Sequence, residues 1–190
     1  MQTPGMITGI LAGIGLAAAS GFRVFLPLFV LSIAAKTGLT GLNEKFAWLG
    51  SDTALIILGV ATLTEIAAYL IPWVDHLLDM LAFPLAGIAG TLAVASTLQH
   101  TDPALTWTLA LIAGGGTATA VQASTSAGRV ASTSATGGLA NPLFAAGESL
   151  VSFLFSVLAL AAPLAAFLLV AAVLYFIYRL AKRKKNTPAA

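Results

Sequence analysis

Cysteine is absent from this chain of 190 residues, and charged residues are scarce. The lack of cysteine excludes disulfides, thiolate metal sites and cysteine nucleophiles together. Two histidines are too few for a metal site built from histidine alone. Only 8% of the residues are charged, whereas soluble domains carry about 25%. Most of the chain is therefore expected to lie in lipid.

Hydrophobic residues make up 58% of the chain, and its mean hydropathy is +0.96. They gather in runs of the length that membrane helices require, which is about 20 apolar residues each. The pattern predicts an all-α polytopic membrane protein with five transmembrane helices, six being the alternative count. The runs cover residues 6–35, 53–73, 84–98, 104–125 and 143–180.

Prolines and glycines predict where these helices bend. Gly21 and Pro27 predict a kinked or broken helix in the first run. Pro72 need not end the second run, because a helical period continues to Leu81, and this extension is expected at the membrane surface. No turn residues surround Pro163, so residues 143–180 are expected to form one long helix.

Residues 124–138 follow neither a helical nor an ordinary loop pattern. They combine many hydroxyl side chains with glycines and a single arginine. At membrane depth, irregular backbone occurs where it is buried in protein or lines a cavity. We therefore expect irregular backbone there, and broken or re-entrant elements in the fold.

Five of the nine basic residues lie in the tail: Arg179, Lys182, Arg183, Lys184 and Lys185. Cytoplasmic segments are enriched in lysine and arginine, so we expect a cytoplasmic tail rather than a nucleic-acid patch. With five spans, the loop bearing Lys36 and Lys45 is cytoplasmic as well, and the N-terminus lies outside. The predicted location is the inner (plasma) membrane, with one transmembrane domain over 1–180 and the basic tail over 181–190.

Two arginines lie inside apolar segments in similar frames. Arg23 follows Ser-Gly-Phe, Arg129 follows Ser-Ala-Gly, and valine comes next in both. An arginine at membrane depth costs from ~3 to over ~10 kcal/mol unless it meets a partner, a cavity or a headgroup. Guanidinium groups bind carboxylates and phosphates at two points. The pair thus indicates an anion or lipid-headgroup site, the alternative being internal ion pairs with Glu65, Asp52 or Glu148.

The two halves of the chain show an internal similarity. Asn43 aligns with Asn141, and residues 66–71 align with 164–169. Three spans separate the starts of the halves, so the second half would enter from the opposite side, as in the inverted repeats of secondary transporters. The alternative is chance alignment of alanine- and leucine-rich helices. The halves would cover 6–82 and 104–180, joined by a helix over 84–98.

Carboxylates and neutral polar residues complete the predicted site. Glu65 lies deepest, where it could relay a proton or neutralise an arginine. Glu148 lies in a helix's first turns, where capping is the alternative role. The substrate-binding residues predicted are Arg23, Arg129, Ser20, Ser126, Asn141, Glu65 and Glu148.

Motifs of catalysis, cofactors and metals do not occur in the sequence. There is no nucleophile elbow, phosphate loop, zinc motif or dinucleotide fingerprint. Asp75 and Asp79 share a helix face, which is more typical of a solvated face than of a cation site. We expect no cofactor, no metal and no enzymatic activity, an intramembrane enzyme acting on a lipid phosphate being the weaker alternative.

The runs GLAAASGFRVFLP at 15–27, SAGR at 126–129 and GGLANP at 137–142 are distinctive. In these runs the chain resembles the bacterial membrane-protein family called domain of unknown function 4126, over nearly its whole length. The resemblance implies a multi-pass membrane protein and supplies no substrate or catalytic residues.

These observations predict a small transporter-like protein that binds or moves a small anion or a phosphate-headed lipid at a central arginine site. The alternative is a non-transporting scaffold or assembly factor whose arginines are paired structurally. The expected partner is the lipid bilayer. The sequence is compatible with a homodimer as well as with a monomer.

Overall fold

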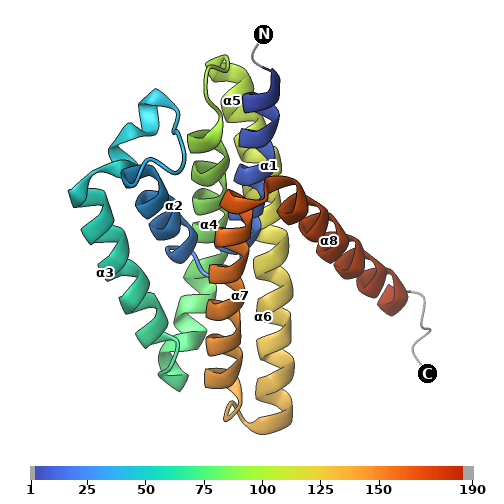
Figure 1. Ribbon diagram of the computed structural model, residues 1–190. Coiled ribbons are helices and arrows are strands. Elements are labelled where there is room, and N and C mark those ends of the chain that lie inside the picture. Colours follow the sequence, from blue (N-terminus) through green and yellow to red (C-terminus); the bar gives the residue numbers. More distant parts are fainter. Residues whose placement is uncertain (1–2, 186–190) are drawn as a thin grey trace.

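The fold is built from helices joined by short connections (Figure 1). The computed structural model describes residues 3–185. The side chains of 3–4, 72–73, 75–76, 180–181 and 183–185 are not described. The elements in chain order are α1 (Thr3–Ser20), α2 (Leu26–Lys36), the 3-10 helix η1 (Glu44–Gly50), α3 (Asp52–Ala68), α4 (Pro72–Thr97), α5 (Pro103–Leu109), the π-helical η2 (Ala110–Gly115), α6 (Gly116–Thr136), α7 (Asn141–Ala161) and α8 (Pro163–Lys185).

Three apolar stretches in the described residues are long enough to cross a membrane: Leu77–Thr97, Pro103–Thr136 and Asn141–Ala161. A fourth arises if η1 and α3, which meet at a bend of 66°, count as one span. The predicted all-α class is confirmed, and the apolar helices are those of a membrane protein with several spans.

The first apolar run is broken where its glycine and proline predicted. α1 ends at Ser20, and Pro27 lies in the first turn of α2, where a missing N–H costs nothing. The chain then doubles back. Gly9 near the start of α1 packs against the Thr97 backbone, and Asn43 beyond α2 donates from Nδ2 to the Leu98 carbonyl at 2.6 Å.

Both ends of the α1–α2 hairpin therefore lie at the C-terminal end of α4 (Figure 1). The expectation that this run crosses the membrane once is wrong. The start of α1 and the loop that follows Lys36 lie at the same end of the bundle.

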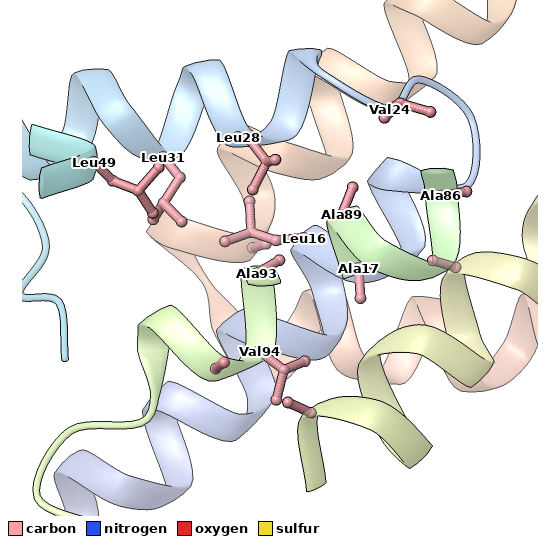
Figure 2. Packing of buried hydrophobic residues seen from close by; sticks show 14 of the residues in the cluster. Leu16, Ala17, Val24, Leu28, Leu31, Leu49, Ala86, Ala89, Ala93 and Val94 are labelled. Carbon is pink, nitrogen blue, oxygen red and sulfur yellow. The ribbon is translucent and has the colours of Figure 1, made fainter. Parts of the chain in front are cut away.

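Helix α1 lies in the centre, packed against α4, α6, α7 and α8. Small residues allow this close approach: a Cβ on Gly15 would come within 2.7 Å of the Ala159 Cβ. Leu16 and Ala17 of α1 join Ala89 and Ala93 of α4 in the main apolar cluster (Figure 2). In lipid such packing replaces the hydrophobic effect as the force between helices.

The second and third runs differ from expectation. The chain turns before Pro72, which occupies the first turn of α4, and α4 then continues through Pro84 as one helix. A separate linking helix over 84–98 is therefore not formed. A proline inside a membrane helix is tolerated because neighbouring groups satisfy the carbonyl that it frees.

The expectation of irregular backbone at 124–138 is wrong up to residue 136, because α6 is helical to Thr136. Several of its hydroxyls bond to the carbonyl one turn earlier, for example Thr136 Oγ1 to Ser132 O at 2.8 Å. Such bonds satisfy the hydroxyl without leaving the helix. Gly137, with φ of 63°, ends it in the left-handed conformation that favours glycine.

The last run is two helices, and the expectation of one long helix is wrong. Pro163 disfavours helical backbone in the residue before it, and Ala162 accordingly adopts φ of −142° and ψ of 71°. α8 consequently leaves the bundle at an angle to α7 (Figure 1). Of the five basic residues of the predicted tail, the side chains of Arg179 and Lys182 are described, and both are exposed.

Candidate functional site: a buried charge cluster at Tyr69

The two predicted arginines meet at one aromatic ring. Arg23 lies in the break between α1 and α2, Arg129 lies in α6, and Tyr69 follows α3. The guanidinium carbons of Arg23 and Arg129 lie 4.0 and 4.4 Å from the centre of the Tyr69 ring. The exposed fractions are 1% for Arg23 and 2% for Arg129. Cation–π attraction is strongest in such desolvated settings.

Glu148 of α7 pairs with both arginines. Arg129 donates from Nε to Oε1 at 3.1 Å and from Nη2 to Oε2 at 2.7 Å. The Nη2 atom of Arg23 lies 3.6 Å from the same Oε2. One carboxylate therefore stands between two guanidinium groups and holds one of them at two points.

Asp79 of α4 supplies a second carboxylate. Its Oδ1 accepts from Arg129 Nη1 at 2.5 Å and from the Tyr69 hydroxyl at 3.4 Å. The sequence interpretation placed Asp79 with Asp75 on a solvated face, and for Asp79 this is wrong. The side chains of Asp75 and His76 lie outside the described residues.

Arg23 is held mainly by neutral groups. It donates from Nε to Ser149 Oγ at 2.9 Å and from Nη2 to the Ala145 carbonyl at 2.6 Å. Its Nη1 is fully buried and has no hydrogen-bond acceptor in the described part of the chain. An unsatisfied buried donor costs about 1–3 kcal/mol, and more when it is charged.

Glu65 lies beside the cluster but bonds to backbone instead of to an arginine. Its two carboxylate oxygens accept from the amides of Val24 at 2.8 Å and Phe25 at 3.1 Å. These amides open α2, where a negative charge is stabilised by the helix dipole. Glu65 thus fixes the backbone of the residues that follow Arg23 in the break between α1 and α2.

The neutral residues predicted for the site bond elsewhere. Ser20 Oγ donates to the Leu16 carbonyl at 3.0 Å, and Ser126 Oγ accepts from Gln122 Nε2 at 3.2 Å. Asn141 Nδ2 donates to Thr133 Oγ1 at 3.1 Å. Of the predicted set, Arg23, Arg129 and Glu148 come together in one cluster, and Glu65 adjoins it.

A model of one protein family matches residues 10–183, and its description is domain of unknown function 4126. The chain belongs to this family. No curated protein and no solved structure matches it. All members of the charge cluster lie within the matched region of this family member.

The four charged groups that pair directly in the cluster balance in this member of the family, and the adjoining Glu65 is a third carboxylate beside them. Arg23 and Arg129 carry two positive charges, and Glu148 and Asp79 carry two negative ones when ionised. The arrangement therefore already contains its own anions. An external anion would enter only with a proton or in place of a carboxylate.

Proposed function

We propose that the protein is a small transporter-like membrane protein that binds an oxyanion, free or as a lipid headgroup, at the Tyr69 cluster. One observation carries this proposal: the Nη1 atom of Arg23 is buried and has no hydrogen-bond acceptor among the described residues. An oxyanion oxygen is the acceptor that a guanidinium prefers.

Charge balance makes this binding proton-coupled. Glu148 faces Arg129 on α6 and Arg23 in the α1–α2 break, with Tyr69 and Asp79 beside them. Uptake of a proton by Glu148 removes one negative charge from the group formed by the cluster and the adjoining Glu65, and an entering anion replaces that charge, so the total charge is unchanged. Lower pH therefore strengthens anion binding.

The topology that we propose has five spans, formed by α3, α4, α5–α6, α7 and α8, with α1–α2 as a re-entrant hairpin. With the basic tail cytoplasmic, the N-terminus and the loop after α2 lie outside. The meeting of both arginine frames at Tyr69 supports a repeat of the two halves. Only α3 and α4 cross between the starts of the halves in this topology, so both halves begin outside and the expected inverted orientation does not follow. Movement of the ligand would follow from rocking of one half against the other.

A structural scaffold is the second candidate, and the pairing of Arg129 favours it. All three guanidinium nitrogens of Arg129 already bond to Glu148 or Asp79. A scaffold with this cluster would bind no anion, and the ion pairs would only fix the packing of α4, α6 and α7.

Sulfate separates the two candidates, because it does not titrate between pH 6 and pH 8. The melting temperature of the purified protein is measured against sulfate at both pH values, for the wild type, Arg23→Gln and the exposed control Lys45→Gln. We expect saturable stabilisation in the wild type and control, strengthened by up to about tenfold in affinity per pH unit as pH falls. A flat response in all three proteins, each well folded, contradicts anion binding.

A further inference from the structure

A narrow apolar cavity of about 300 Å³ lies between α3 and α4, directly beside the charge cluster. Its lining combines Tyr69 and Glu65 with the apolar residues Phe25, Leu78, Ala82 and Leu85. The volume lies at the lower end of the range for ligand pockets.

Tyr69 belongs both to the lining of this cavity and to the charge cluster. Its ring contributes to the cavity wall and also carries the guanidinium groups of Arg23 and Arg129 at 4.0 and 4.4 Å. Val24, the neighbour of Arg23, lines the same cavity. A molecule in the cavity therefore lies against residues that belong to the cluster or are next to it in the chain.

The cavity opens toward lipid rather than water. Leu81 and Leu85, two of its lining residues on α4, are 58% and 37% exposed. Thr64 on the facing helix α3 is also exposed. Both helices are spans in the topology that we propose, in which acyl chains surround this opening.

From this juxtaposition we infer that the ligand of the cluster is an anionic lipid. Its phosphate head binds at Arg23, and its chain lies in the cavity between α3 and α4, through which it enters from the bilayer. This inference rests on the proposed function and names its substrate class. The apolar part of the cavity matches a lipid chain, which is as apolar as the leucines there, whereas a free inorganic anion gains nothing from this lining and uses the arginine end alone.

A second cavity of about 310 Å³ provides a matched control. It is lined by apolar residues only, among them Val30, Leu160 and Ala161, and it contains none of the cluster residues. A phenylalanine at Ala161 fills it without approaching the arginines. Phenylalanine at Ala61, which is half-buried, or at the exposed Thr64 fills the cavity beside Tyr69.

The test is thermal unfolding of the protein in dodecyl maltoside with three probes: 1-palmitoyl-lysophosphatidic acid, lysophosphatidylcholine with the same chain, and inorganic phosphate. We expect lysophosphatidic acid to raise the melting temperature saturably, and to bind about tenfold or more tightly than either other probe. Ala61→Phe and Thr64→Phe should weaken this binding about tenfold, whereas Ala161→Phe leaves it unchanged.

The outcomes separate the lipid inference from the proposed function. Equal binding of inorganic phosphate and lysophosphatidic acid, lost in Arg23→Gln but kept in Thr64→Phe, overturns the lipid inference and leaves the anion site standing. Lipid binding that survives Arg23→Gln, or no binding of any probe to a folded wild type, overturns both.

Discussion

Arg129 and Glu148 form a two-point ion pair between α6 and α7, with donor–acceptor distances of 3.1 and 2.7 Å. Arg129 is 2% exposed and Glu148 is 8% exposed, so water screens the pair little. The pair fixes how the two helices of the α6–α7 hairpin are aligned. Because desolvation opposes the attraction, its value lies more in defining this alignment than in net stability.

Removing one member of this pair should destabilise the protein strongly, because the other charge is left buried. We expect Glu148→Leu and Arg129→Met each to lower the free energy of unfolding by about 3–5 kcal/mol. The double variant should lose clearly less than the sum of the two. Unfolding in mixed micelles measures this, and additive losses would contradict the pairing.

An exposed ion pair serves as the control for that experiment. Lys36 pairs with Asp52 between the end of α2 and the start of α3, with exposed fractions of 38% and 81%. Asp52→Asn should change the free energy of unfolding by no more than about 1 kcal/mol.

Glu65 should contribute to stability through the backbone of α2. Glu65→Ala leaves the Val24 and Phe25 amides without their acceptors, at a cost of about 1–3 kcal/mol. Glu65→Gln keeps one acceptor oxygen and should cost less. Amide hydrogen exchange at Val24 and Phe25 should quicken in Glu65→Ala, and unchanged exchange would show that Glu65 does not hold this turn.

The ring of Tyr69 should matter more than its hydroxyl. Tyr69→Phe keeps the ring under both guanidinium groups and loses the contacts of the hydroxyl with Asp79, at 3.4 Å, and with Arg129, so we expect a cost of about 1 kcal/mol. Tyr69→Leu removes two desolvated cation–π contacts and should cost about 2 kcal/mol or more. Equal losses in the two variants would refute a role for the ring.

Close packing of α4 against η2 should make Gly90 intolerant of a side chain. A Cβ there would lie 2.6 Å from both the Ala118 Cβ and the Gly114 carbonyl oxygen. Gly90→Ala should therefore cost about 1–3 kcal/mol. Gly147 in α7 has open space at its Cβ position, so Gly147→Ala should be neutral or stabilise the protein by up to about 1 kcal/mol. The reverse order of melting temperatures would contradict this packing.

The sequence predicted that Arg23 and Arg129 belong to the site, because a charged residue inside an apolar run indicates a buried polar site. It also predicted the helix break near Gly21, since glycine and proline act locally. It did not show that the chain reverses there, because the angle between two helices depends on what both pack against.

Tyr69 and Asp79 were missed for the same reason. Each looks ordinary in its own segment, a tyrosine after alanines and an aspartate on a helix face. Their role arises only where the ends of α3 and α4 meet α6 and α7, and such a meeting is a tertiary contact. The many hydroxyl side chains of α6 led to the wrong prediction of irregular backbone there. Serine and threonine hydroxyls can bond to carbonyls of their own helix, so they do not by themselves indicate a cavity lining.

The central claim is that Arg23 binds an anion from outside the chain. Equilibrium dialysis with radiolabelled sulfate at pH 6 tests it most directly, with wild type, Arg23→Gln and Lys45→Gln compared at equal folded fraction. The account predicts saturable binding by the wild type and by Lys45→Gln, and its loss in Arg23→Gln. Absence of bound sulfate in the folded wild type, or equal binding by Arg23→Gln, would contradict it.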